Sequence, residues 1–245
     1  MPLFYLDSTI LLLIPALLLA LWAQFKVKST YARFSKVGNR AGLTGADVAQ
    51  FILRNAGVPL ADRLGYGGER AGQPACALEV TGGHLTDHYD PRSRTLRLSQ
   101  DVYYGQSVAA LGIAAHEVGH AIQHARSYGP LLLRSVMYPI SSIGSTLAFP
   151  LFFIGIFMPV GLGQTMMHAA IALFTVAVLF TLVTLPVEFN ASKRALRALS
   201  DGGYLADDEL DGARKVLNAA AMTYVAAAAM AIMQLVRMIL IADRR

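Results

Sequence analysis

The chain has 245 residues, of which 55% are hydrophobic and only 15% are charged. Soluble domains carry about a quarter of charged residues, and here the apolar residues are gathered into long runs. The composition therefore excludes an ordinary soluble domain and predicts an integral membrane protein in contact with the lipid bilayer. The net charge of +5 is spread between the apolar segments. Because no dense basic run is interleaved with aromatic residues, we expect no nucleic-acid partner.

The first apolar run covers residues 9–25 and is about long enough to cross a bilayer. Five basic residues follow it within residues 26–40 and none precedes it, which is the reverse of a cleaved signal peptide. Basic residues stay on the cytoplasmic side of a membrane. We therefore predict a retained transmembrane anchor over residues 1–25, with its N-terminus outside the cell.

A polar segment, residues 26–128, comes next. We expect a short helix near residues 29–36 and a second helix after Thr44, because Thr44 and Asp47 form a short-acid variant of the capping box. Residues 95–99 alternate polar with apolar side chains, which predicts a half-buried strand. Ser107 is placed to cap a further helix that runs to about residue 126.

Residues 129–245 contain three more apolar spans. Two lie within residues 131–160 and 168–187, joined by the uncharged linker 161–164, and the last covers residues 219–242. Arg237 lies inside the last span, so an interfacial position for that helix stays open. Residues 26–134 hold 13 Lys and Arg and residues 188–215 hold 5, whereas residues 159–167 hold none. This asymmetry predicts about four spans, with both polar regions in the cytoplasm.

The sequence HEVGH, residues 116–120, carries the clearest chemical signal. On a helix, His116 and His120 lie one turn apart on one face, at a spacing suited to gripping a single Zn2+ ion. Glu117 can reach the open coordination position and act as general base for a water that attacks a peptide carbonyl. The motif also arises by chance, but a strand before it, a helix around it and a later carboxylate favour zinc binding. The single Cys76 excludes an intramolecular disulfide, and we interpret it as a buried inert thiol rather than a ligand.

A catalytic zinc usually has three protein ligands and a water. His124 continues the spacing, but it lies about 12 Å along the helix from His116, so we assign it to the helix end or to support of the ligands. Glu188 is the better third ligand, because a carboxylate at the end of an apolar span is costly without a partner. The alternative is an ordinary interfacial glutamate. Ser192, one turn later, can support the ligands from behind.

Two further groups stay open. His84 and His88 lie in a polar stretch, residues 82–91, which we read as a turn beside the active cleft or, alternatively, as a second metal site. Arg194 can stabilise the oxyanion that develops during peptide hydrolysis. An ordinary basic residue at the cytoplasmic interface explains Arg194 equally well.

These residues together resemble the YugP-type neutral zinc metallopeptidases, a bacterial family. The resemblance covers nearly the whole chain after the first anchor, and the stretches that carry it are 42–45, 84–91, 107–124, 184–192, 194–196 and 219–225. It implies a membrane-bound zinc peptidase similar in logic to the gluzincins, whose third ligand is a downstream glutamate. The resemblance therefore supports Glu188 and implies no particular substrate.

The expected fold is mainly α: a bundle of about four transmembrane helices with a small zincin-like α+β cytoplasmic part. We expect residues 1–25 to form the anchor, 26–128 the cytoplasmic part with the HEVGH helix, and 129–245 the remaining transmembrane helices, with the Glu188 helix at the cytoplasmic boundary. The strand at 95–99 is expected to offer an edge to an extended substrate. The predicted location is the inner membrane, with the active site facing the cytoplasm.

The expected function is a zinc-dependent endopeptidase that cuts membrane or membrane-proximal proteins or peptides. A membrane-protein partner or a homo-oligomer stays open. The main alternative is a non-catalytic zinc-binding membrane adaptor or chaperone, but a structural zinc site needs no base such as Glu117. A metal transporter would need polar ligands deep in the spans, and these spans have almost none.

Overall fold

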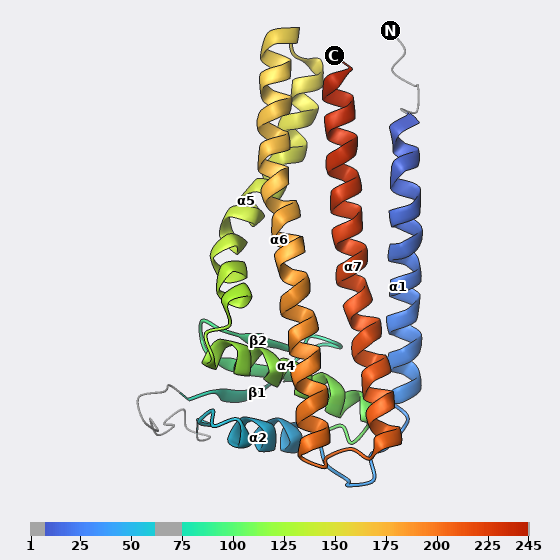
Figure 1. The fold of residues 1–245 in the computed structure, drawn as a ribbon, viewed down its shortest axis with the longest axis vertical. Helices are drawn as coiled ribbons and strands as arrows, with labels where there is room; N and C mark the ends of the chain where they lie inside the picture. Colours follow the sequence, from blue (N-terminus) through green and yellow to red (C-terminus); the bar gives the residue numbers. More distant parts are fainter. Residues whose placement is uncertain (1–7, 62–74, 245) are drawn as a thin grey trace. The chain divides into compact units, whose positions relative to one another are not determined.

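Helices dominate the computed structural model, which describes residues 8–61 and 75–244 (Figure 1). The chain divides into two units. The first comprises Met1–Phe25, Leu132–Pro186 and Met222–Arg245, and the second comprises Lys26–Leu131 and Val187–Ala221. Four long helices contribute residues to both units: α1 (Leu13–Phe34), α5 (Gly129–Phe157), α6 (Val160–Asp201) and α7 (Asp207–Asp243). Each unit is described by itself below.

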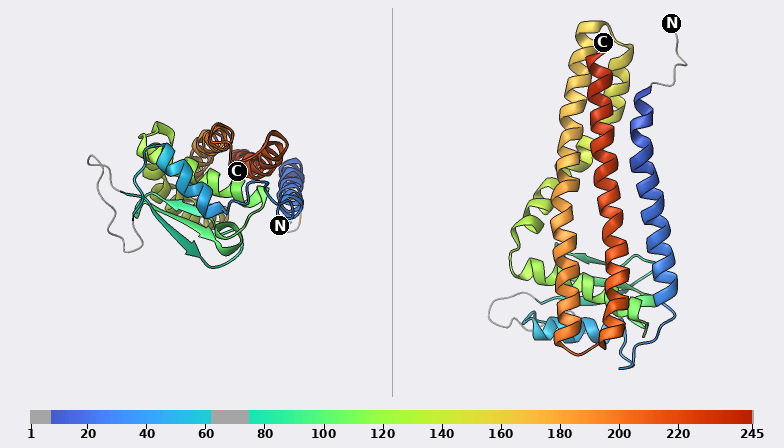
Figure 2. Two further views of the ribbon diagram at one scale, coloured as in Figure 1. Left: turned by 90° about the horizontal axis from the view of Figure 1, so that it is seen from below. Right: turned by 45° about the vertical axis from the view of Figure 1, so that its right-hand side comes forward.

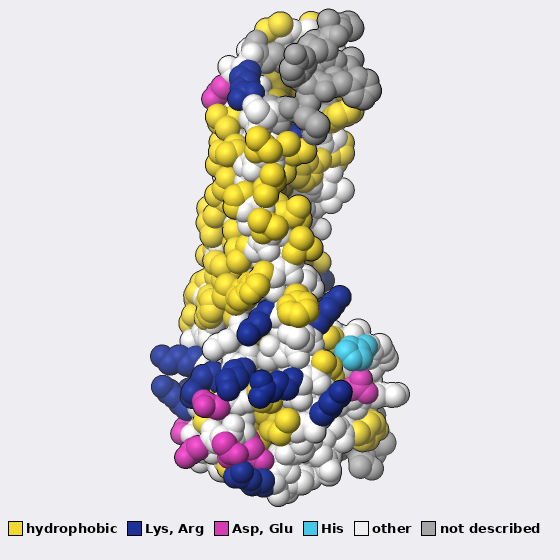
Figure 3. Space-filling model, turned by 90° about the vertical axis from the view of Figure 1, so that its right-hand side faces the viewer, with side chains coloured by type: hydrophobic (Ala, Val, Ile, Leu, Met, Phe, Trp, Pro, Cys, Tyr) yellow, Lys and Arg dark blue, Asp and Glu magenta, His cyan; other side chains and the backbone are white. Residues whose placement is uncertain are grey.

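Four helices of the described chain are long and apolar enough to cross a membrane. They are Ser8–Phe34, formed by the short 3-10 helix η1 (Ser8–Leu12) and α1, then α5 (Gly129–Phe157), α6 and α7. The expectation of a mainly α fold with four spans is confirmed. On the face drawn in Figure 3, hydrophobic side chains predominate over the first unit, whereas charged side chains gather over the second. Such broad exposed apolar surface suits lipid rather than water.

The helix boundaries differ from those expected at three places. Residues 29–36 form no separate short helix, because α1 continues unbroken to Phe34. Residues 161–164 are no linker, since α5 ends at Phe157 and α6 begins at Val160. The last helix begins at Asp207, far before residue 219, and has acidic residues in its first turn, where they stabilise the helix dipole. These extensions were not predicted because their sequence is polar. A helix can nevertheless continue through polar sequence when one of its faces is buried.

The second unit contains the sheet. Its three strands are β1 (Ala77–Thr81), β2 (His88–Asp90) and β3 (Thr95–Ser99), in the order β1-β3-β2. β3 pairs parallel to β1 and antiparallel to β2, so the strand expected at 95–99 is confirmed. Its expected role as a free edge is wrong, because β3 is the central strand and both of its edges are paired. Leu96 and Leu98 of β3, which point to the same face of the sheet, are fully buried, whereas Arg97 on the opposite face is partly exposed.

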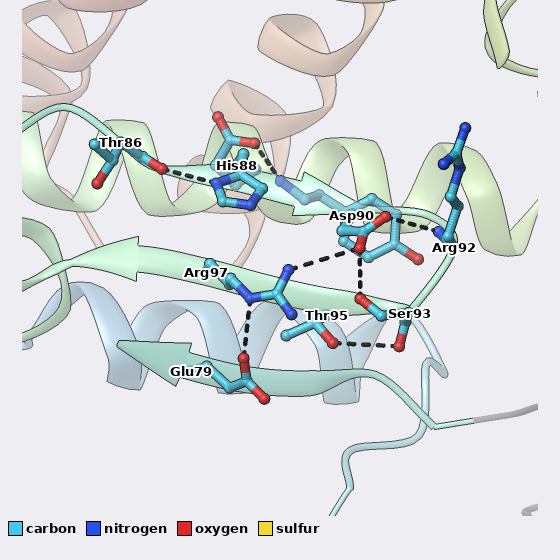
Figure 4. A network of polar contacts seen from close by, with 10 residues as sticks. Glu79, Thr86, His88, Asp90, Arg92, Ser93, Thr95 and Arg97 are labelled. Carbon is cyan, nitrogen blue, oxygen red and sulfur yellow. Dashed lines mark hydrogen bonds and ion pairs between the residues drawn. The ribbon is translucent and has the colours of Figure 1, made fainter. Parts of the chain in front are cut away.

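Arg97 of β3 ties the three strands together on one face of the sheet (Figure 4). Its Nε lies 3.0 Å from Oε2 of Glu79 on β1, and its Nη1 lies 3.6 Å from Oδ2 of Asp90 on β2. Asp90 also accepts hydrogen bonds from the Arg92 N–H and the Ser93 hydroxyl, which close the turn after β2. These cross-strand contacts hold the short edge strand β2 against β3.

Helices α2 (Gly45–Asn55), α3 (Gln100–Tyr103) and α4 (Val108–Ala125) complete the second unit. The expected capping box is confirmed: the Thr44 side chain accepts from the Asp47 N–H, and Asp47 accepts from the Thr44 N–H. Ser107 caps α4 by accepting from the Ala110 N–H at 3.1 Å. Helix α4 packs against α2 and α3 and against the sheet through β2 and β3 (Figure 2). The HEVGH helix is therefore fixed on several sides.

Gly119 lets α4 approach the part of α6 that belongs to the second unit. A Cβ atom at this position would lie 2.7 Å from the carbonyl oxygen of Ala191 and 3.1 Å from its Cα. Both neighbours are backbone atoms that cannot rotate away, so only glycine fits. Ala191 itself is fully buried. This close approach brings the segment that follows Val187 onto the HEVGH helix.

Candidate metal centre

Two helices of the second unit supply the side chains of the candidate centre. Helix α4 presents His116 and His120 one turn apart, and α6 presents Glu188, 72 residues after His116. His120 and Glu188 are 8% and 2% exposed. The Nε2 atom of His116 lies 3.2 Å from Oε2 of Glu188, and that of His120 lies 3.5 Å from the same oxygen. The three residues expected as ligands thus meet at one point.

The geometry of this cluster fits a zinc ion. One ligand atom from each of His116, His120 and Glu188 lies within 4.8 Å of the others, and this is the one such group of three in residues 8–61 and 75–244. Tetrahedral zinc with bonds of about 2.0–2.2 Å separates its ligand atoms by about 3.3–3.5 Å. The separations of 3.2 and 3.5 Å between the two imidazole nitrogens and the Glu188 oxygen are close to that value. Two imidazoles and one carboxylate also form a typical catalytic donor set.

Both histidines have a second partner on the nitrogen that faces away from Glu188. The Nδ1 atom of His120 lies 3.0 Å from Oε1 of Gln123, and Nδ1 of His116 lies 3.1 Å from the Ser192 hydroxyl. Ser192 thus takes the supporting position expected of it. Such partners orient metal-binding imidazoles and set which nitrogen carries the proton.

Gln123 determines the tautomer of His120. Its Nε2 donates to the Val187 carbonyl at 2.8 Å and to Oδ1 of Asn190 at 3.0 Å. Because a carbonyl can only accept, the amide orientation of Gln123 follows, and its Oε1 must accept from Nδ1–H of His120. The lone pair of Nε2 in neutral His120 is therefore directed to the side of Glu188, where a metal ion requires it.

Protons compete for the same cluster. Burial lowers the pKa of His120, but the hydrogen bond to Glu188 and the negative charge of Glu117 outweigh it, and the net shift is upward. The ion pair between His120 and Glu188 therefore favours a protonated imidazole in the absence of metal. A bound cation would displace that proton and take over the role of compensating the carboxylates.

Glu117 lies beside the ligands and has a different partner. Its Oε2 accepts a hydrogen bond of 3.0 Å from the backbone N–H of Tyr89 on the edge strand β2. Loss of solvent raises the pKa of Glu117, while the charges of His116 and His120 oppose the rise. A partly desolvated carboxylate next to a metal-binding helix has the basicity that a general base needs near neutral pH.

His124 lies in the last turn of α4 and is not part of the cluster. Its Nδ1 lies 2.8 Å from the Tyr89 hydroxyl, and burial followed by the charge of Arg94 lowers its pKa. The hydroxyl contact therefore favours a neutral imidazole that accepts the Tyr89 proton. The placement of His124 at the helix end, away from the three ligands, agrees with the sequence-based expectation.

The other candidates from the sequence have separate surroundings. His84 lies 3.7 Å from Asp101 and packs edge-on against Tyr31, whereas Nδ1 of His88 bonds to the Thr86 carbonyl within its own loop (Figure 4). The two histidines share no partner in the described residues. Cys76 is buried in the core, as expected of an inert thiol. Arg194 donates from Nε to Oδ1 of Asn190 at 2.7 Å, and its guanidinium carbon lies 5.9 Å from the centre of the Tyr128 ring.

Sequence reasoning missed three groups. The Tyr89 N–H is a backbone donor, and no side-chain pattern can reveal its target. Gln123 was detectable in principle, because it follows His120 by three residues on the same helix and so faces the same side. Asn190, two residues after Glu188, links Gln123 to Arg194 through its Oδ1. This link closes a hydrogen-bonded path from His120 to Arg194.

Comparison with known proteins agrees with this chemistry. The family model described as "Putative neutral zinc metallopeptidase" matches residues 9–62 and 69–243. The "Putative membrane protease YugP" of Bacillus subtilis (strain 168) is 45% identical over 233 residues, which cover 95% of each chain. No solved structure matches the chain. The resemblance found in the sequence is thus confirmed, and the chain belongs to the family of putative neutral zinc metallopeptidases.

Proposed function

We propose that this protein is a membrane-bound zinc-dependent endopeptidase that hydrolyses membrane or membrane-proximal proteins at the cytoplasmic face. The observation that carries the proposal is the meeting of His116, His120 and Glu188, with Glu117 next to them but outside the ligand set. A purely structural zinc site has four protein ligands and no adjacent base. Three ligands and a free carboxylate leave room for a water molecule and a substrate carbonyl.

His116, His120 and Glu188 would hold the zinc ion, with Ser192 and Gln123 behind the two imidazoles. Zinc bound there would lower the pKa of a water molecule and polarise the scissile carbonyl. Glu117 accepts a proton from the water as its oxygen bonds to the carbonyl carbon. The same carboxyl then returns the proton to the leaving nitrogen as the carbon–nitrogen bond breaks. Its raised pKa suits both directions of transfer.

The edge strand β2 supplies a place for the substrate backbone. Its inner side pairs with β3, and the Tyr89 N–H on its other side is directed at Glu117. A segment of substrate that is extended along the free side of β2 would bring its peptide bonds to the general base. Addition of a strand to an exposed edge is a common way to bind unfolded peptide segments, and it replaces the role that we had expected of residues 95–99.

The cytoplasmic orientation rests on charge. The 13 Lys and Arg of residues 26–134 and the 5 of residues 188–215 lie in the sequence that forms the second unit or directly adjoins it, and such residues remain in the cytoplasm. We test this with two single-cysteine additions at exposed positions: N55C, at the end of α2, and G161C, at the start of α6. A membrane-impermeant maleimide applied to intact cells should label G161C and spare N55C until the cells are opened. The reverse pattern would place the candidate site outside.

The peptidase proposal is tested with the detergent-solubilised, zinc-loaded full chain on unfolded casein and on membrane-protein substrates. Glu117→Gln should keep one zinc per chain and lower kcat by about 100-fold or more. The matched control Glu79→Gln removes an acid of the second unit that pairs with Arg97 instead, and it should retain activity. In native membranes Glu117→Gln should also retain bound substrate for identification. The proposal would be overturned if the wild-type chain cleaves no substrate and cells that carry Glu117→Gln behave like wild-type cells.

A further inference from the structure

The second unit contains a cavity of about 350 Å³ on which three arginines converge. Arg126 follows the C-terminal turn of α4, and Arg194 and Arg197 lie on α6. Asn55 of α2 and Tyr204 line the same cavity. None of His116, Glu117, His120 and Glu188 belongs to its lining, so the cavity is distinct from the candidate metal centre.

The cavity carries an excess of positive charge. Arg126 and Arg197 are close enough to repel Arg194 electrostatically, and Asp201 is the one acidic residue in the lining. In the part of the chain that the structure describes, the side chains of Arg126 and Arg197 form no hydrogen bond and no ion pair. Asp201 balances one of the three positive charges, so two like charges remain close together, which is unfavourable. Their convergence is explained when an anion occupies the space between them.

The polar groups of the cavity are set up as donors. Arg194 donates from its Nε to Asn190, and its guanidinium carbon lies 5.9 Å from the centre of the Tyr128 ring, a cation–π contact that helps to hold the group in place. The Tyr204 hydroxyl accepts from Nδ2 of Asn55 at 2.9 Å and keeps its own proton to donate. The Tyr204 ring is fixed in turn by stacking on Phe51 at 5.8 Å. Several donors and little acceptor capacity match a ligand rich in oxygen acceptors.

We propose that this cavity binds a phosphate group, either the headgroup of an anionic phospholipid or free phosphate. Guanidinium groups bind phosphate oxygens through paired parallel hydrogen bonds, and three of them can share the oxygens of one tetrahedral group. Clusters of Lys and Arg also bind the headgroups of anionic lipids. The proposal is independent of the peptidase activity.

The choice of variants follows from the surroundings of Arg194. Asn190 and Gln123 connect Arg194 to His120 by hydrogen bonds, so replacing Arg194 would disturb the candidate metal centre as well. Arg126→Gln and Arg197→Gln leave that path intact. Lys193→Gln is the matched control, because Lys193 is an exposed cation on the same helix outside the cavity.

Isothermal titration calorimetry on the full chain, solubilised in a neutral detergent and loaded with zinc, measures the binding. Inorganic phosphate and dihexanoyl-phosphatidylglycerol are titrated separately at constant ionic strength. We expect one site per chain for at least one of the two. Arg126→Gln and Arg197→Gln should each weaken it at least about tenfold, since each removes charge-assisted hydrogen bonds. The affinity of Arg197→Lys should lie between those of the wild-type chain and Arg197→Gln, because lysine keeps the charge but lacks the planar guanidinium group.

The two titrants identify the source of the phosphate. Binding of phosphatidylglycerol alone assigns the cavity to a lipid headgroup, and binding of inorganic phosphate shows that the free ion is sufficient. Phosphate bound at the zinc ion would not respond to Arg197→Gln and would therefore be recognised. The proposal is wrong if neither titrant binds, if binding survives both arginine substitutions, or if Lys193→Gln weakens it as much as they do.

Discussion

The backbone N–H of Tyr89 donates a hydrogen bond of 3.0 Å to Oε2 of Glu117, so the edge strand of the sheet directly holds the proposed general base. The side chain of the same residue reaches His124 at the end of the helix, with 2.8 Å between the hydroxyl and Nδ1. Glu117 and His124 lie seven residues, about two helical turns, apart on one face of α4. Tyr89 therefore fixes the edge strand β2 to α4 at two points, Glu117 and His124.

Tyr89→Phe removes the contact with His124 and leaves the backbone N–H in place. We expect the free energy of unfolding to fall by about 1 kcal/mol, with zinc still bound. The double variant Tyr89→Phe/His124→Leu should lose less unfolding free energy than the sum of the two single variants, because either change alone already removes the hydrogen bond. Chemical denaturation of the four proteins measures this coupling. Tyr104→Phe, at an exposed tyrosine, is the control. If the losses in unfolding free energy of the two single variants add fully in the double variant, Tyr89 and His124 do not stabilise the fold through their hydrogen bond.

Glu188→Gln should abolish stoichiometric zinc binding, because a neutral amide is a poor replacement for the carboxylate that lies 3.2 and 3.5 Å from the two imidazoles. Zinc content of the purified chain, determined by atomic emission after dialysis, gives the answer. Asp201→Asn removes an exposed acid from the same helix and should leave one zinc per chain. Full zinc content in Glu188→Gln would return Glu188 to the role of an ordinary interfacial glutamate.

Ser192→Ala and Gln123→Ala should each weaken zinc binding by about 10–100-fold, the usual effect of removing a partner that orients a metal-binding histidine. Ser192 supports His116 and Gln123 supports His120. Competition with a chelating dye measures the affinity. Ser200→Ala changes an exposed serine later on α6 and should have no effect. Equal affinities in all three variants would show that the imidazoles need no such support.

Gly119→Ala should destabilise the second unit by about 1–3 kcal/mol, as overpacking of a close contact does. The added Cβ would meet the Ala191 backbone at 2.7 Å and push α6 away from α4, so zinc affinity should fall as well. Gly112→Ala is the matched control on the same helix, since its Cβ would have its nearest neighbour at 3.4 Å. A melting temperature of Gly119→Ala equal to that of Gly112→Ala would contradict the tight helix contact.

Cys76 should react slowly with thiol reagents while the chain is folded. Burial raises the pKa of its thiol from 9.0 to about 11, so the thiolate fraction at pH 8 falls by roughly 100-fold, and the side chain is also shielded. Because the folded pKa is raised, the protonated thiol favours folding, and this contribution is lost as pH rises from about 9 through 11. Labelling kinetics with and without denaturant measure the difference. Equal rates in both conditions would place Cys76 outside the core.

Local patterns account for most of the elements. The capping box at Thr44 and Asp47, the cap at Ser107 and the alternation in β3 depend on neighbours within a few residues, and all three were predictable. Helix lengths were not, because α6 and α7 continue through polar sequence wherever one face is buried. The central place of β3 was also hidden, since pairing depends on strands that lie elsewhere in the chain.

The sequence alone determined that His116 and His120 share one helix face with Glu117 beside them, because that follows from the helical repeat. It also singled out Glu188, through the cost of an unpaired carboxylate at the end of an apolar run. Only the tertiary structure decided that this carboxylate meets the two imidazoles 72 and 68 residues away in the chain. The Tyr89 N–H likewise reaches Glu117 only through packing, because backbone donors are the same at every residue and the fold alone directs them.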